Sequence, residues 1–354
     1  MIDEAVLSSG PGETRIALLD GGQVVEFVVD RGGVAAGDVL DGRIVEIAPA
    51  TGAAFVDIGE GSPAFMPKAK DLSVGMMVPV MVTVGMRRGK GAEVKRAPAG
   101  AGLGRRGALA RALASHPTIR TVTVDQAAAL GPARGLFRAA THRPNGFEQS
   151  GAAEALEEAL APRVALAGGA ALIFAETEAA TVIDIDGGGL PPAEANRLAI
   201  DALARQLRLR AIGGHILVDI IPTRDRNAVA KLVAATRAAV AGDPAPVQVA
   251  GHTPLGMIEL TRKRHGPSLA EIMLVPTGIE RNSLTVALDG LRALLRETIS
   301  RPGARLALAV PPRVARAIDA RPSLLAEAGR ALGRAPVLVE RGDVEMFAIE
   351  EMAR

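Results

Sequence analysis

Two short apolar segments of this chain each contain aspartate at a position where a buried strand would normally carry an apolar side chain. The first, residues 181–189, reads TVIDIDGGG and includes Asp184 and Asp186; the second, residues 214–221, reads GHILVDII and includes Asp219. Carboxylates are rarely buried without a partner. One explanation is a divalent cation shared between two strand ends, since Mg²⁺ is typically held by one or two carboxylates plus waters. The other is that each aspartate caps a helix or pairs with an arginine.

The elements around these segments favour the metal site. Residues 192–209 have the apolar spacing of a long amphipathic helix, and Gly213 and Gly214 after it are suitable for its C-terminal cap. Strand, helix and strand then form a βαβ unit, in which the two strands are parallel. Ligands of open α/β sheets bind beyond the carboxyl ends of the strands. Asp184 and Asp219 are therefore expected to converge on one site.

The basic residues form clusters that suit a polyanionic ligand. The chain has a net charge of only +2 but a pI of about 9.3, with 6 Lys against 35 Arg, and guanidinium groups bind phosphate oxygens in a bidentate fork. Each cluster alone is more often a solvated surface, but three of them beside candidate metal carboxylates favour a polyanion. The clusters are Arg87, Arg88, Lys90, Lys95 and Arg96; Arg205, Arg208 and Arg210; and Arg262, Lys263, Arg264 and His265.

The N-terminal third has the pattern of β structure. A hairpin is predicted over residues 15–30 around Gly21 and Gly22, followed by short strands that suggest a small barrel, at residues 37–47, 53–59, 63–67 and 75–84. Phe55 and Phe65, two of only seven Phe residues, lie on neighbouring strands of this barrel. Exposed aromatic side chains on an OB-fold stack nucleic-acid bases, whereas the alternative is that both rings belong to the core.

The remainder has an α/β pattern. Helices are predicted at residues 147–160 and 284–299, and strands at residues 121–125, 170–176, 306–310 and 337–340. Residues 276–354 show no site chemistry, which favours a packing or dimerisation role.

Composition excludes several classes of protein. Hydrophobic residues make up 48% of the 354 positions but aromatic residues only 2%, so Ala, Val, Leu and Ile must form the core. The absence of Cys excludes disulfides and cysteine-ligated zinc. No apolar run reaches the roughly 20 residues of a membrane span, and no secretion signal is visible at the start, so we expect a cytoplasmic protein with no membrane partner.

Several longer motifs resemble the ribonuclease E/G family. ATGAAFVDIG from residue 50 and AFMP from residue 64 resemble its RNA-binding OB-fold barrel. PRVAL from residue 162, ETEAATVID from residue 176, Asn196 and ARQLRLR from residue 204 are similar to its catalytic part. So are GMIELTRKR from residue 256 and PSL from residue 267. The likeness is patchy before residue 120 and nearly continuous from about 145 to 270.

The resemblance implies a Mg²⁺-dependent endoribonuclease specific for single-stranded RNA, with Mn²⁺ as a substitute ion. Asp184 and Asp219 would be the metal ligands, and products would carry a 5′-phosphate and a 3′-hydroxyl. Asp186 stands where the family usually has Asn, and would add a third ligand or orient water, so it joins the catalytic candidates. The candidate RNA-binding residues are Phe55, Phe65, Lys90, Arg205, Arg208, Arg210, Arg262, Lys263 and Arg264.

The implied fold is mixed α/β. It has an RNase H-like and DNase I-like catalytic core, an inserted OB-fold barrel and a small C-terminal α/β domain. The predicted division is an N-terminal hairpin part of the RNase H-like subdomain at 1–35, the barrel at 36–98, a short linker at 99–116, the RNase H-like continuation at 117–165, the DNase I-like subdomain at 166–275 and the C-terminal domain at 276–354.

Three departures from the family pattern leave a second function open. About twenty residues near Pro98 to Pro117 replace the domain that senses the RNA 5′ end. Residues 275–278 and the lack of Cys remove the zinc link between subunits, so no zinc is expected, although a homodimer is still allowed. Gly187, Gly188 and Gly189 replace side chains that could touch RNA. The alternative is therefore a degenerate relative that binds RNA without cutting it; a different phosphoester hydrolase is a third reading.

Overall fold

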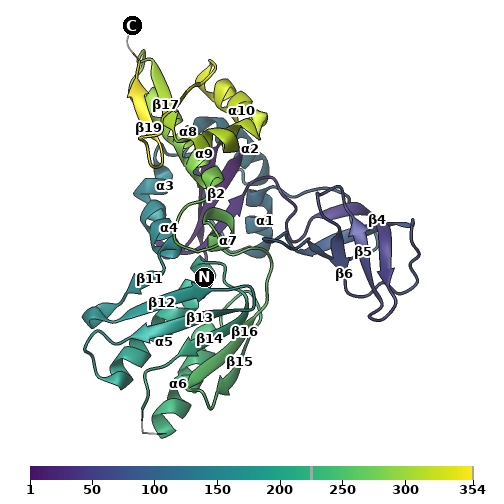
Figure 1. Ribbon diagram of the computed structural model, residues 1–354, viewed down its shortest axis with the longest axis vertical. Helices are drawn as coiled ribbons and strands as arrows, with labels where there is room; N and C mark the ends of the chain where they lie inside the picture. The colour runs from purple at the N-terminus through teal and green to yellow at the C-terminus, as the bar shows by residue number, and fades with distance from the viewer. Residues whose placement is uncertain (224–225, 353–354) are drawn as a thin grey trace.

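The chain folds into three β-sheets, a closed barrel and the helices that cover them (Figure 1). The computed structural model describes residues 1–223 and 226–352, apart from the side chain of Arg226. No helix in this described part is both long enough and apolar enough to cross a bilayer. The mixed α/β class with a small barrel, predicted from the sequence, is confirmed.

The first sheet has the strand order β10-β9-β1-β2-β3. The predicted hairpin is present as antiparallel β2 and β3, and its turn residues Gly21 and Gly22 have φ of 56° and 82°, a conformation that favours glycine. The strands are β1 (Glu4–Gly10), β2 (Glu13–Asp20), β3 (Gln23–Asp30), β9 (Thr121–Val124) and β10 (Thr141–His142).

Four helices accompany this sheet. The single helix predicted over residues 147–160 is divided in two, because Ser150 ends one helix and Gly151, with φ of 73°, precedes the next. Helix α1 lies inside the segment predicted as a linker, and it buries Ala108, Leu109 and Ala112. The helices are α1 (Ala108–Ser115), α2 (Ala127–Leu136), α3 (Gly146–Gln149) and α4 (Ala152–Leu160).

The barrel closes in the order β4-β5-β6-β8-β7, with β4 paired to β7. Alternate residues such as Ala54, Val56, Val80 and Val94 fill its core. Its strands are β4 (Val39–Ala48), β5 (Ala53–Asp57), β6 (Ala64–Met66), β7 (Met77–Val84) and β8 (Glu93–Arg96).

The third unit is a six-stranded sheet with the order β11-β12-β13-β14-β16-β15. Helices α5 (Pro192–Leu209) and α6 (Arg226–Val240) pack beside each other against it (Figure 1). A short 3-10 turn, Ala167–Gly169, follows the first strand. The strands are β11 (Arg163–Ala165), β12 (Ala171–Glu176), β13 (Ala180–Asp186), β14 (Gly214–Asp219), β15 (Val247–His252) and β16 (Met257–Arg262).

The C-terminal part begins with the short helix α7 (Leu269–Met273) and contains the three-stranded sheet β18-β17-β19. Its core joins α8 to β17, as in the buried side chains of Leu291 and Leu308. The elements are α8 (Ser283–Ser300), β17 (Leu306–Val310), α9 (Pro312–Asp319), α10 (Pro322–Leu332), β18 (Val337–Glu340) and β19 (Ala348–Glu351).

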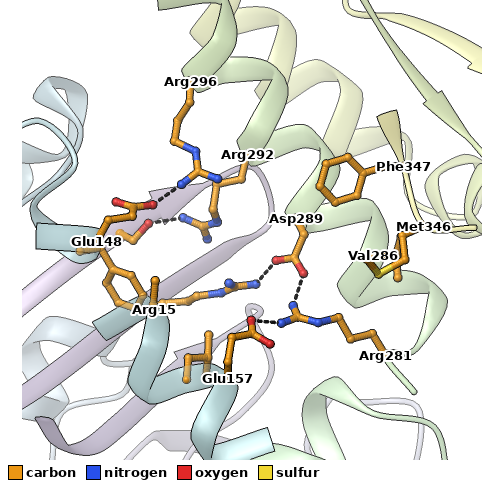
Figure 2. A pocket seen from close by; sticks show the side chains of 14 residues that line it. Arg15, Glu148, Glu157, Arg281, Val286, Asp289, Arg292, Arg296, Met346 and Phe347 are labelled. Atoms are coloured by element: carbon orange, nitrogen blue, oxygen red, sulfur yellow. Dashed lines mark hydrogen bonds and ion pairs between the residues drawn. The ribbon is translucent and has the colours of Figure 1, made fainter. Parts of the chain in front are cut away.

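Ion pairs fix this C-terminal part to the first sheet. A hollow of about 340 Å³ lies between α8, α4 and the first sheet. Arg15 donates to Asp289 there at 2.6 Å, and Figure 2 draws this contact. Asp289 also accepts from Arg281, which in turn pairs with Glu157. The other two arginines of the hollow, Arg292 and Arg296, pair with Glu13 and Glu148. Because each of the four arginines has a carboxylate partner, the hollow is a charge-balanced junction.

Candidate active site

Asp184 and Asp219 are direct neighbours on adjacent strands. The structure confirms that β13 and β14 are parallel, and their register pairs the Cα atoms of the two aspartates. Adjacent strands lie about 4.8 Å apart, and residues opposite each other project from the same face of a sheet. The two carboxylates therefore emerge side by side from one face, although the helix α5 separates them in the sequence.

The two faces of this sheet have opposite characters. Ile183, Ile185, Ile216 and Val218 alternate with the aspartates and are buried against α5 and α6. Asp184 on the opposite face is exposed, and Asp219 is half-buried. This period-2 alternation means that the apolar residues that bury one face also hold the carboxylates on the other.

A single row of side chains crosses the open face. The register aligns Arg163 with Ile173, Ile173 with Asp184, Asp184 with Asp219, and Asp219 with Met257. The carboxylate pair therefore lies between two half-buried apolar side chains, with a cation at one end of the row.

Asp186 is engaged by the protein. Arg163 Nη2 donates to Asp186 Oδ2 at 2.7 Å, and the Gly188 backbone N–H donates to Asp186 Oδ1 at 3.0 Å. The hydrogen bond from Gly188, followed by that from Arg163, lowers the pKa of Asp186 below its usual range. The part of the chain that the structure describes contains no group of three or more His, Asp or Glu side chains placed to hold a metal. The geometry thus supplies two free carboxylates, and the predicted metal role of Asp186 stays a prediction.

Asn196 fixes the chain just after Asp219. Its Nδ2 donates to the Ile221 carbonyl at 2.9 Å, and its Oδ1 accepts from the Ile221 N–H at 2.9 Å. The side chain is fully buried on α5. In the sequence, Asn196 stood out only as part of a motif. An amide among the apolar positions of an amphipathic helix could have indicated its role, because a buried amide needs hydrogen-bond partners.

All five predicted RNA-binding arginines have protein partners, and Arg205, Arg210 and Arg262 have the shortest contacts. Arg210 is buried, donates to the carbonyls of Glu158 and Ala161, and has its pKa lowered by burial to about 10. Arg262 forms a two-point ion pair with Asp243 at 2.8 and 2.9 Å, and Arg205 pairs with Glu158 at 2.8 Å. These contacts position helix α5 and strand β16, so RNA binding by these three residues stays a prediction.

Arg208, Lys263 and Arg264 line a different region, a large cavity beside the barrel. Lys90 is exposed in the turn between β7 and β8. The three basic clusters of the sequence therefore do not gather around the aspartates. Arg87, Arg88, Arg208 and residues 262–265 come together at the opposite end of β14.

The two barrel phenylalanines form a cross-strand pair. Phe55 on β5 and Phe65 on β6 are directly opposite, with ring centroids 5.9 Å apart and planes tilted by 58°. Phe65 is 37% exposed and Phe55 is half-buried, while their neighbours Ala54 and Val56 point into the core. The rings thus lie on the outer surface of the barrel, as base stacking requires.

Comparison with known proteins agrees with the motif resemblance. The sequence model described as "Ribonuclease E/G family" matches residues 124–265, which include both β13 and β14. The chain is 39% identical over 126 residues to Ribonuclease E of Nostoc sp., covering 33% of this chain and 18% of that protein. It is 30% identical over 177 residues to Ribonuclease G of Salmonella typhimurium, covering 46% of this chain and 36% of that protein. It is 33% identical over 177 residues to Ribonuclease E of Escherichia coli, covering 45% of this chain and 16% of that protein.

These matches show that residues 124–265 of the chain are similar to the ribonuclease E/G family. The resemblance inferred from the motifs is therefore confirmed. The chain spans well under two thirds of the length of the relatives it matches.

Proposed function

We propose that this chain is an endoribonuclease that cuts single-stranded RNA with the help of Mg²⁺, which Mn²⁺ can replace. The observation that carries the proposal is the in-register pairing of Asp184 and Asp219 on the open face of a sheet that lies in the family region. The names of the relatives support RNA as the substrate. The RNase H-like and DNase I-like character of the two larger sheets is part of the same proposal.

The donor set suits a hard cation. Two adjacent, accessible carboxylates match the one or two that usually hold Mg²⁺ together with waters and substrate phosphate. When bound, the cation would supply an activated water for attack on phosphorus and offset charge on the non-bridging oxygens. The carboxylates of Asp184 and Asp219 would hold it, and Asn196 would keep the end of β14 in place through Ile221.

The side chains around the carboxylates supply binding and orientation. Arg163 lies two strands from Asp184 in the same row, with its guanidinium at Asp186. From the edge of the row it would contact a phosphodiester that approaches the aspartates. The barrel rings Phe55 and Phe65 would stack bases without reading their sequence, which fits a single-stranded substrate.

A direct assay separates this function from its alternative. Wild-type protein is incubated with a labelled single-stranded RNA in Mg²⁺, in Mn²⁺ and in EDTA. The proposal expects internal cuts in the presence of metal, products with a 5′-phosphate and 3′-hydroxyl, and no cleavage in EDTA.

The alternative is an RNA-binding protein that has lost catalysis. The engagement of Asp186 by Arg163 and the small Gly187–Gly189 loop favour it, because fewer groups remain to hold metal and substrate. Binding of the same RNA without cleavage under any divalent metal would select this alternative. We also propose a cytoplasmic location and allow a homodimer, although neither function requires them.

A further inference from the structure

A large hollow in the described part of the chain is remote from the aspartate pair. A cavity of about 810 Å³ lies where the segment leaving the barrel at Gly85 meets β3, α1 and the segment that follows β16. Figure 1 shows the barrel projecting from the rest of the molecule beside α1. The Gly85 N–H donates to the His265 carbonyl at 3.0 Å, which anchors the barrel at the cavity wall. We call this hollow the barrel cleft.

The barrel cleft carries an excess of positive charge. Eight arginine and lysine side chains line it together with the carboxylates of Glu26, Asp30 and Glu271, and Glu13 and Asp243 outside the lining pair with Arg31 and Arg262. The smaller hollow of Figure 2 differs, because each of its arginines has a carboxylate partner. Ion pairs therefore account for every arginine of the smaller hollow, but they leave Arg88 and Lys263 of the barrel cleft without a carboxylate among the described residues.

Two of the eight cations in the barrel cleft, Arg88 and Lys263, lack a carboxylate partner among the described residues. Lys263 and the imidazole of His265 have no ion pair or side-chain hydrogen bond to any described residue. The Arg88 guanidinium donates only to backbone carbonyls, those of Glu271 and Leu274. Arg208 is held by Glu26 at 3.3 Å. Donors without acceptors in a hollow are what a phosphate oxygen would satisfy.

The electrostatics agree with this arrangement. Burial, followed by the charge of Arg87, lowers the pKa of Arg264 below its usual value. Burial, followed by the charges of Lys263 and Arg262, lowers the pKa of His265. The positive charges of Arg87 and Arg264 therefore repel each other when the cleft contains no anion, and a bound anion would relieve that repulsion and favour the protonated form of His265.

The barrel cleft is separate from the candidate active site. Arg262, at the cleft, pairs with Gly214 at the first residue of β14, whereas Met257 pairs with Asp219 at the last. Five residues of extended strand correspond to about 17 Å. One mononucleotide cannot fill the cleft and also reach both aspartates, but a polymer can contact the two places at once.

We propose that the barrel cleft binds the phosphodiester backbone of the RNA at a distance from the bond that is cut. This inference rests on the proposed ribonuclease function, which supplies the polymer. Lys263 and Arg88 contact phosphate oxygens, with His265 and Arg208 beside them, and the barrel that carries the stacking rings is anchored at the wall of the cleft. The contacts are to the backbone, so they hold the strand without selecting its sequence.

The test measures binding without cleavage. The wild type, Lys263→Gln, and Arg88→Gln combined with Lys263→Gln are titrated with a fluorescent uridine oligomer of about 20 nucleotides in EDTA, at several salt concentrations. Each lost phosphate contact should weaken binding several-fold and reduce the slope of log affinity against log salt by about 0.7. Lys231→Gln is the matched control, because Lys231 is an exposed lysine on α6 outside the cleft, and it should leave both quantities unchanged.

The outcomes separate this inference from the proposed function. Unchanged affinity and slope in both cleft variants, with melting temperatures equal to that of wild type, would overturn the barrel cleft as an RNA site. That result would leave cleavage in Mg²⁺ untouched as evidence for the enzyme. A wild type that binds through the cleft but never cleaves would instead overturn the proposed function and keep the cleft.

Discussion

Arg163 and Asp186 form an ion pair across the edge of the candidate active site, with Nη2 and Oδ2 2.7 Å apart. Together with the Gly188 N–H, this contact takes up both carboxylate oxygens of Asp186. The neighbouring Asp184 and Asp219 have no counter-ion among the residues that the structure describes, and they stand free on the open face. The three acidic residues of the two segments are therefore not equivalent.

Asp186→Asn should retain most of the cleavage activity, within about tenfold of wild type, which corresponds to roughly 1.4 kcal/mol in the barrier. The amide oxygen of Asn can still accept from Gly188, and no carboxylate that holds the metal is lost. Rates of cleavage of one labelled RNA under saturating Mg²⁺ measure the effect. A loss as large as that of an Asp184 variant would show that Asp186 holds the metal.

Asn196→Ala should raise the Mg²⁺ concentration needed for half-maximal cleavage by about tenfold, the lower end of the effect of losing a residue that orients a metal ligand. The reason is that Ile221 loses both of its hydrogen bonds to Asn196, so the end of β14 that carries Asp219 is less well fixed. Thr236→Val on α6 is the control, because it also removes a fully buried polar group. A Mg²⁺ dependence unchanged in Asn196→Ala and lower stability in both variants would limit Asn196 to a structural role.

Phe65→Ala and Phe55→Ala should each weaken single-stranded RNA binding by about 1–3 kcal/mol, the usual worth of stacking one base on an aromatic ring. Binding is measured by fluorescence anisotropy in EDTA. Val45→Ala is a matched control, since Val45 is 41% exposed on β4 of the same barrel and offers no ring. If both Phe variants unfold while the affinity of the folded fraction is unchanged, the rings serve the barrel and not the RNA.

Glu13→Gln should lower the free energy of unfolding at pH 7 by about 3–5 kcal/mol, because it leaves buried arginines without their carboxylate. Burial would raise the pKa of Glu13, but Arg15, Arg31 and Arg292 outweigh it and hold the pKa below the usual 4.5. A carboxylate with a depressed pKa stabilises the fold above about pH 4.5, and this contribution is lost as the pH falls through the folded pKa.

The difference between wild type and Glu13→Gln in urea unfolding should therefore shrink as the pH is lowered from 7 to below 4.5. Asp343→Asn is the contrasting variant, since Asp343 pairs with Arg341 at an exposed site and its loss should barely move the midpoint. If the difference in unfolding free energy between wild type and Glu13→Gln stays constant with pH, the charge of Glu13 contributes nothing to stability.

The strands that carry the aspartates could be predicted because their physics is local. Ile183, Ile185, Ile216 and Val218 alternate with polar residues, and α5 between them forces the strands to be parallel. Strand β8 was not predicted, since three of its four residues, Glu93, Lys95 and Arg96, are exposed and only Val94 packs inward. Its place in the barrel depends on β6 and β7, which lie earlier in the chain.

The roles of the arginines could not be predicted from clustering alone. Arg210 and Arg262 look as basic in the sequence as Lys263, yet their partners come from α4 and from the segment before β15. The carboxylate of Asp243 that neutralises Arg262 is 19 residues away in the chain. A cluster reports charge density along the chain, whereas function depends on which of those charges the fold leaves unpaired.

The most direct test of the account is the cleavage of single-stranded RNA by Asp184→Asn and by Asp219→Asn in Mg²⁺. Each substitution keeps the size of the side chain and removes one of the two carboxylates that meet across β13 and β14. We expect cleavage to fall by several orders of magnitude in each variant while RNA binding in EDTA is unchanged, because the carboxylates hold the cation and not the RNA. Cleavage at the wild-type rate in either variant would contradict the two-aspartate site.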